Sequence, residues 1–173
     1  MDLLLKNMSE IGEKSFKNER DMVDVCLILG ASVYEKIELL AERHNVDINK
    51  AFSEFINVAS EIIVALKDDN TKMLSCRRDG TEEPFIFSSL SQKEDKNGED
   101  DERGYKIIPF KITKEQKLAL DYLAVENNQE PGELFYSFIE FGLIVGDPDE
   151  ILVFREKGEE DKIITLFEYG DCY

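Results

Sequence analysis

The sequence predicts an α+β fold in which a unit of strand, helix, helix and hairpin occurs twice. The first observation is a seven-residue phrase, LLAERHN at 39–45, which returns as YLAVENN at 122–128, an offset of 83 residues. The second is that residues 25–63, laid on 108–146 at this offset, match in their apolar positions. The identical pairs are Leu40/Leu123, Ala41/Ala124, Asn45/Asn128, Phe52/Phe135, Phe55/Phe138 and Ile56/Ile139, and the matching apolar pairs are Val25/Ile108, Leu27/Phe110, Leu29/Ile112, Ile37/Leu120, Leu39/Tyr122 and Ile62/Val145. A repeated pattern of apolar positions indicates an internal duplication.

Each unit is expected to open with a strand, at residues 25–29 (VCLIL) and 107–112 (IIPFKI). Both segments alternate or run apolar over the length of a strand. A helix is expected to follow each strand directly, because both strands end at a helix start signal. The expected capping boxes are Ser32 with Glu35 in the first unit and Thr113 with Gln116 in the second.

An asparagine stands where each first helix should stop. Asparagine tolerates the left-handed backbone of a helix C-terminus better than other residues except glycine, so Asn45 and Asn128 predict a turn. A second helix is then expected to begin near Asp47 or Asn49 in the first unit and near Pro131 in the second.

A hairpin is expected at the end of each unit. After a five-residue length change, CRRDG at 76–80 matches FREKG at 154–158, and each lies between two short β-prone runs. The polar, acidic segment between the units has no apolar periodicity and is expected to be a flexible linker. The expected organisation is an N-terminal helical arm at 1–20, a first unit with its hairpin at 21–90, an acidic linker at 91–104 and a second unit with its hairpin at 105–173.

Composition and charge narrow the function classes. The 173 residues are 42% hydrophobic, which is enough for a core, and carry a formal net charge of −17. The sequence has no apolar run long enough to span a membrane and no signal-peptide pattern, so a cytoplasmic protein without membrane contact is expected. A field of this sign repels nucleic-acid phosphates and attracts basic proteins.

No motif for catalysis, cofactor binding or metal binding is recognisable. The single histidine, His44, is expected to cap a helix end. The acidic runs at 147–150 and 159–161 lack the spacing of a calcium loop and are expected to form a turn and a hairpin tip. Three reduced thiols, two of them buried, are expected at Cys26, Cys76 and Cys172.

The order of strand, helix, asparagine turn and helix resembles the ribbon-helix-helix fold of the Arc and MetJ type. The positions that carry the resemblance are Leu29-Gly30, Leu40-Ala41 and Asn45 in the first copy and Ile112-Thr113, Leu123-Ala124 and Asn128 in the second. Such proteins are obligate dimers, so the resemblance implies that the two strands pair antiparallel within one chain and form an intramolecular pseudo-dimer. It also implies kinship with bacterial DNA-binding repressors and antitoxins, which read the major groove with the outward residues of the ribbon.

The residues expected on the outward face do not suit base reading, because only one of them is basic. These residues are Asp24, Cys26, Ile28, Ile107, Pro109 and Lys111. The family's phosphate clamp at the second helix would carry the carboxylates Asp47 and Glu130. We expect residues 2–16, with an apolar helical stripe, to form a helix that lies on Cys26 and Ile28.

The sequence therefore agrees with two functions. The first is a non-enzymatic acidic interaction protein, an adaptor, inhibitor or nucleic-acid-mimicking decoy that binds a basic protein such as a nucleic-acid-binding protein. Its binding residues would be Asp47, Glu54, Glu61, Glu126, Glu130, Glu133 and Glu140. The alternative is a DNA-binding transcription regulator or antitoxin that contacts DNA through Lys106, Lys111, Arg77 and Arg78. In either case a monomeric pseudo-dimer, or a homodimer of it, without cofactor is expected.

Overall fold

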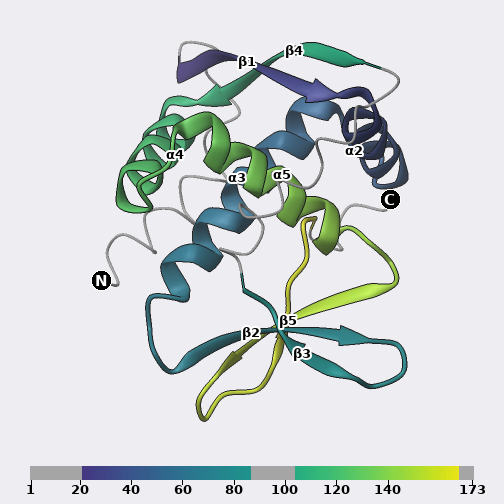
Figure 1. Cartoon of the computed structure of the whole chain (residues 1–173), viewed down its shortest axis with the longest axis vertical. Coiled ribbons are helices and arrows are strands. Elements are labelled where there is room, and N and C mark those ends of the chain that lie inside the picture. The colour runs from purple at the N-terminus through teal and green to yellow at the C-terminus, as the bar shows by residue number, and fades with distance from the viewer. Residues whose placement is uncertain (1–20, 87–103, 168–173) are drawn as a thin grey trace.

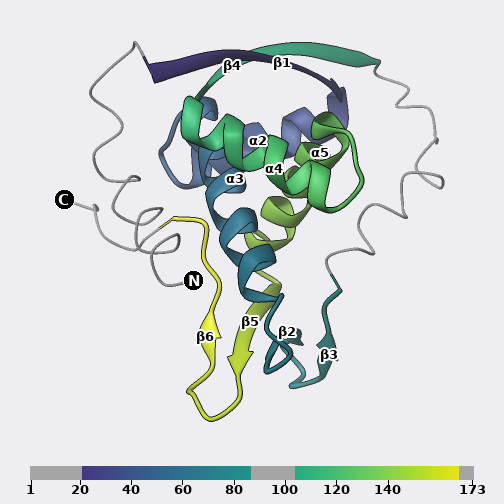
Figure 2. The ribbon, with the colours of Figure 1, turned by 90° about the vertical axis from the view of Figure 1, so that its left-hand side faces the viewer.

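The computed structural model describes residues 21–86 and 104–167. The expected N-terminal arm, nearly all of the acidic linker and Cys172 lie outside the described residues. Within them the protein is α+β, with four helices and two antiparallel sheets. A two-stranded ribbon lies above the helices and a four-stranded sheet lies below them (Figures 1 and 2).

The ribbon consists of β1 (Met22–Gly30) and β4 (Tyr105–Thr113), which pair antiparallel over nine residues each. Cys26 lies opposite Pro109, at the centre of the ladder. Both strands are longer than the sequence predicts, because β1 begins three residues before Val25 and β4 two residues before Ile107. Inward and outward residues alternate along both strands, as the pleat of a strand requires.

The first helix of each unit starts directly after the ribbon. In α4 (Lys114–Glu126) the expected capping box is present, because Thr113 accepts from the Gln116 N–H and Gln116 accepts from the Thr113 N–H. The capping box expected at Ser32 and Glu35 is wrong. The N-cap of α2 (Ala31–Arg43) is Gly30, so Ser32 already belongs to the first helical turn.

The turn between the helices has the same geometry in both units. Asn45 and Asn128 have φ angles of 53° and 52°, as the sequence predicts. Beyond them lie α3 (Ile48–Ala65), with Asp47 as its N-cap, and α5 (Pro131–Val145), which begins at a proline. Three hydrogen bonds from a backbone N–H to a backbone oxygen recur at the 83-residue offset. His44 to Leu40 matches Asn127 to Leu123, Asn45 to Glu42 matches Asn128 to Val125, and Val46 to Ala41 matches Gln129 to Ala124.

The lower sheet joins the two hairpins. Its strands are β2 (Thr71–Arg77), β3 (Glu82–Pro84), β5 (Glu150–Glu156) and β6 (Lys162–Ile163), in the order β3-β2-β5-β6. The bond from Phe85 N to Met73 O has the same length, 2.9 Å, as that from Ile164 N to Leu152 O. The equivalent residues of these two bonds are 79 positions apart in the sequence. The hairpins therefore match at an offset one residue longer than the alignment of CRRDG with FREKG gives.

Aromatic side chains connect the ribbon to the helices. Phe110 points inward from β4, and its ring centroid lies 4.5 Å from that of Phe52 on α3 and 5.3 Å from that of Phe135 on α5. The helices α3 and α5 cross closely at Gly142, where an added Cβ would lie 2.1 Å from a ring carbon of Phe55. The core is therefore continuous from the ribbon through the crossing of α3 and α5.

Candidate functional site

The outward face of the ribbon is exposed at every predicted position: Asp24, Cys26, Ile28, Ile107, Pro109 and Lys111. Ile28 and Ile107 face each other across the strands and are 67% and 72% exposed. Lys111 lies opposite Asp24, whose carboxylate offsets its charge. This face therefore presents a mainly apolar surface with one balanced pair of charges. The arm expected to cover it lies outside the described residues.

The basic residues proposed as DNA contacts lie at two separate ends of the molecule. Lys106 belongs to the ribbon, and its Nζ lies 4.6 Å from the centroid of the Tyr34 ring. Arg77 and Arg78 belong to the hairpin of β2 and β3, below the helices (Figure 1). The guanidinium groups of these two arginines pair with Glu83 at 3.5 Å and Asp149 at 2.5 Å, respectively. The four cations therefore do not form one basic surface.

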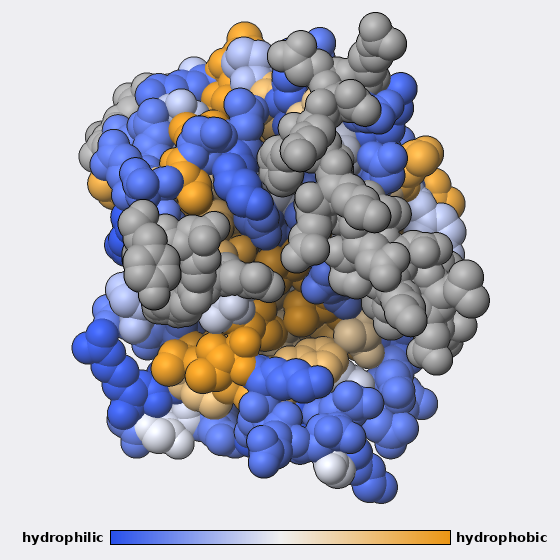
Figure 3. Space-filling model, turned by 180° about the vertical axis from the view of Figure 1, so that it is seen from behind, coloured by the Kyte–Doolittle hydropathy of each residue, from blue (hydrophilic) through white to orange (hydrophobic). Residues whose placement is uncertain are grey.

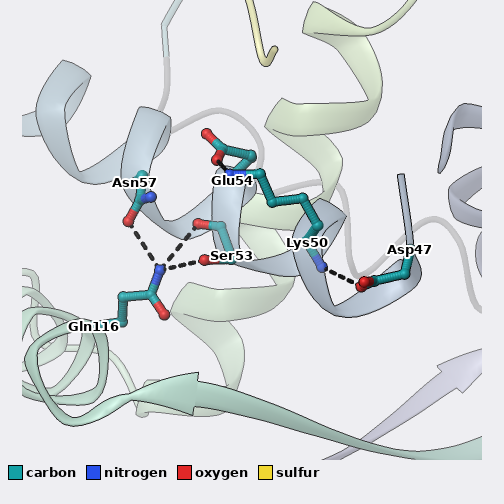
Figure 4. Close-up of polar contacts among 6 residues, drawn as sticks. All are labelled: Asp47, Lys50, Ser53, Glu54, Asn57 and Gln116. Carbon is teal, nitrogen blue, oxygen red and sulfur yellow. Dashed lines mark hydrogen bonds and ion pairs between the residues drawn. The ribbon is translucent and has the colours of Figure 1, made fainter. Parts of the chain in front are cut away.

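The predicted acidic residues of the first unit lie along one side of α3. Asp47, Glu54 and Glu61 are spaced seven residues apart, which places them on the same helix face. Asp47 accepts the Lys50 N–H at 2.8 Å, and the Lys50 ammonium pairs with Glu54 (Figure 4). Glu61 is on the exposed surface, yet desolvation of its carboxyl group and the charge of Glu54 raise its pKa.

A buried amide fixes α4 against this side of α3. The Gln116 Nε2 donates to Ser53 Oγ at 2.6 Å and to Asn57 Oδ1 at 3.0 Å (Figure 4). Gln116 lies on the same side of α4 as the buried Leu120 and Leu123, so these hydrogen bonds hold the inner side of α4 against α3.

The other predicted carboxylates gather where α4 ends and α5 begins. Glu126 accepts from Tyr122 Oη at 2.6 Å and pairs with the Lys67 ammonium. Hydrogen bonds from Lys67 and then from Tyr122 hold the pKa of Glu126 below its usual value. Glu130 is the N-cap of α5, and its N–H donates to Glu133 at 3.4 Å. Glu140 is half-buried farther along α5. Six of the seven predicted acidic residues therefore form two groups, and Glu140 lies two helical turns beyond the second group.

A cavity of about 880 Å³ lies between the end of α3, the lower sheet and the turn between α4 and α5. Its described lining is mainly apolar with a cationic rim: Ile63, Leu66, Lys67, Thr71, Lys72, Met73, Leu74, Pro84, Phe85, Ile86, Asn127, Gln129, Leu134, Ser137 and Arg155. This described lining contains no carboxylate, imidazole or thiol. Arg155 on its rim is already held by Glu82 and Asp161.

The remaining titratable candidates have structural surroundings. The His44 ring lies 4.7 Å from that of Phe167, and burial together with the charge of Arg43 lowers its pKa. The expectation of two buried thiols is wrong: Cys26 is exposed, because it lies on the outward side of the ribbon, and Cys76 is half-buried. In residues 21–86 and 104–167, no group of three His, Cys, Asp or Glu residues could hold a metal ion.

Three apolar side chains on the outer side of α4 were not predicted as a surface. Leu118, Tyr122 and Val125 are 68%, 61% and 80% exposed. Tyr122 matches Leu39 in the apolar pattern of the repeat, and Leu39 is also exposed, at 60%. The sequence pattern could have indicated this surface, because the three positions recur at i, i+4 and i+7 on the side of α4 opposite Leu120 and Leu123.

Comparison with protein-family models, with curated proteins and with solved structures finds no match to this chain. None of the helices in the described ranges combines the length and apolar character needed to cross a membrane. A proposal about function therefore depends on the geometry and charge of the surfaces described above.

Proposed function

We propose that the chain is an internal duplication that folds as an intramolecular ribbon-helix-helix pseudo-dimer. In a two-fold arrangement, residue i of one copy meets residue j of the other and j meets i. The ribbon register has this property, because Val25 lies opposite Phe110 while Leu27 lies opposite Ile108, and each residue's counterpart is 83 positions away. The recurring turn bonds and the two left-handed asparagines support the same proposal.

On this scaffold we propose a non-enzymatic regulatory protein that binds a basic protein surface, as an adaptor, an inhibitor or a nucleic-acid-mimicking decoy. The observation that carries the proposal is the position of carboxylates at the N-termini of α3 and α5. Asp47 and Glu130 are the N-caps of these helices. A helix N-terminus attracts anions, but here the protein's own carboxylates occupy it. With a net charge of −17, the attraction is for cationic partners.

The test is binding of an oligolysine peptide to the full chain, measured by fluorescence anisotropy at low and at physiological salt. Glu61→Gln with Glu133→Gln removes two charges, and the amide can keep the capping contact to Glu130. We expect each lost carboxylate to weaken binding by about 0.2–1 kcal/mol at low salt. The matched control, Glu159→Gln with Glu160→Gln, removes the same charge from the tip of the β5–β6 hairpin. Equal losses in the two variants would refute a specific acidic surface.

The alternative of a DNA-binding regulator or antitoxin draws support from the ribbon itself. A two-stranded antiparallel ribbon is one of the elements that fit the major groove. The same assay with a DNA duplex tests this alternative, because binding through the ribbon must weaken with salt and must depend on Lys111. Duplex binding that Lys111→Gln abolishes would replace the proposal of a basic protein partner with that of a DNA site.

A further inference from the structure

The outer side of α4 carries a contiguous apolar stripe of Leu118, Tyr122 and Val125, called here the α4 stripe. Each member is more than half exposed. The inner side of α4 buries Leu120, Leu123 and Ala124, so the helix is apolar on two opposite sides. A single exposed apolar residue is ordinary on a protein surface, but a contiguous set on one helix face marks a contact surface.

The first unit provides an internal comparison for this stripe. At the 83-residue offset, α2 has Glu35, Leu39 and Glu42 where α4 has Leu118, Tyr122 and Val125. The two helices follow equivalent ribbon strands and end in equivalent asparagine turns. The fold therefore tolerates glutamate at two of these three positions. The apolar residues of α4 add nothing to the described core, so they require another explanation.

The C-terminal end of the stripe has a defined shape. Tyr122 donates its hydroxyl to Glu126 Oε1 at 2.6 Å, and the Lys67 ammonium, which also pairs with Glu126, lies 5.9 Å from the centre of the Tyr122 ring. These contacts restrict the rotamers of an exposed aromatic side chain before any partner arrives. Less conformational entropy is then lost on binding.

Charge differs between the two ends of the stripe. At the N-terminal end, Lys117 pairs with Asp121 and Lys114 pairs with Asp21. At the other end, Glu126 pairs with Lys67, and Glu130 and Glu133 follow at the N-terminus of α5. The C-terminus of α4 adds the negative end of a helix dipole. A helical partner would be held most favourably with its cationic residues at this end.

We propose that the α4 stripe is the docking surface for an amphipathic helix of a partner protein. The partner helix would place apolar side chains at i, i+4 and i+7 on Leu118, Tyr122 and Val125, and lysines or arginines of one end beside Glu126, Glu130 and Glu133. The inference rests on the proposed function, because it specifies the kind of basic partner that the protein would bind. Figure 3 shows the molecule from behind, with an apolar band across its middle and mainly hydrophilic residues at its bottom. On that face, the bottom of the molecule therefore offers no comparable apolar surface.

The test uses a synthetic amphipathic helical peptide with leucines at these spacings and lysines at one end. Its binding to the full chain is measured by isothermal titration calorimetry. Leu118→Glu with Val125→Glu copies the residues of α2 onto α4 and makes the protein more acidic. We expect it to weaken binding by about tenfold or more, although simple attraction between charges would strengthen binding. Leu39→Glu on α2 is the control and is expected to leave the affinity unchanged. Thermal unfolding of both variants checks that they fold.

A second peptide, with its leucines replaced by glutamine and its lysines kept, separates the two proposals. We expect this peptide to bind more weakly than the first, and Leu118→Glu with Val125→Glu should not weaken its binding. If both peptides bind equally well and the double variant changes neither affinity, the α4 stripe is not the docking surface, while the acidic-surface proposal stands. If an uncharged version of the first peptide binds as tightly as the lysine version, the basic-partner proposal fails and the apolar surface remains.

Discussion

Replacing Gly142 by alanine should destabilise the fold more than any other glycine-to-alanine change inside α5. The new Cβ would lie 2.1 Å from Phe55 Cδ1 and 2.5 Å from Cε1. Phe55 is fully buried and lies edge-on to Phe52, at a centroid distance of 6.2 Å, so its ring has no open space to enter. Overpacking of a core costs about 1–3 kcal/mol, and a clash this short belongs at the upper end.

Alanine also offsets part of that cost, because it is favoured over glycine in a helix interior by about 1 kcal/mol. The net loss is therefore about 2 kcal/mol, which for a chain of this size corresponds to a fall in Tm of about 4–8 °C. Urea unfolding followed by circular dichroism measures the change as a shift in midpoint at constant slope.

Gly132→Ala provides the matched control, because it is the same chemical change in the same helix. No atom lies within 4 Å of a Cβ added at Gly132, so the change should be neutral or slightly stabilising. If Gly142→Ala is as stable as Gly132→Ala, α3 and α5 do not cross with the close approach described here.

Three further outcomes are expected. Asn45→Ala and Asn128→Ala each place a Cβ residue without a polar side chain at a φ above 50° and should each cost about 1 kcal/mol in chemical unfolding, whereas the glycine variants should not. Gln116→Leu leaves Asn57 and Ser53 without their buried donor and should cost about 1–3 kcal/mol; a neutral result would mean that water replaces the amide. Lys67→Met should raise the pKa of Glu126 toward its ordinary value in an NMR titration, because Lys67 is the main cause of the lowering. A carboxyl group whose pKa is lowered by folding stabilises the protein above its unfolded-state pKa, and this stability is lost as the pH falls. The variant should therefore lose less stability on acidification than the parent.

The fold was predictable where one residue type satisfies one local requirement. Asn45 and Asn128 marked the helix turns because few residues tolerate a positive φ. The alternation along β4 identified its inward side because a pleated strand leaves only two choices. The antiparallel pairing of β1 with β4 followed the resemblance, and the register supports the proposed pseudo-dimer without depending on any single side chain.

The errors arose where the sequence allowed competing assignments. Ser32 and Glu35 fit a capping box, but the position equivalent to Thr113 is Gly30, so the repeat itself contained the better answer. The hairpin alignment shifted by one residue because the apolar runs of β2 and β5 match almost equally well at neighbouring offsets.

The candidate surfaces were only partly predictable. The six residues expected on the outward side of the ribbon are exposed, because the pleat of a strand alternates its side chains. Tyr122 was assigned to the buried pattern because an apolar residue in an amphipathic helix usually faces the core, and only the structure shows the second apolar side of α4. Tertiary pairing of Glu126 with Lys67 joins residues of different units, which no local pattern encodes.

Both sheets are built across the two units. β1 pairs with β4 in the ribbon, and β2 pairs with β5 in the lower sheet, so each unit supplies only one side of each central ladder. A unit expressed alone would expose an unpaired strand edge at both ends of its helices and should not fold by itself. Cleavage within residues 91–104 would therefore give two fragments that regain structure only when mixed, and two intact chains at high concentration could exchange units to form a domain-swapped dimer.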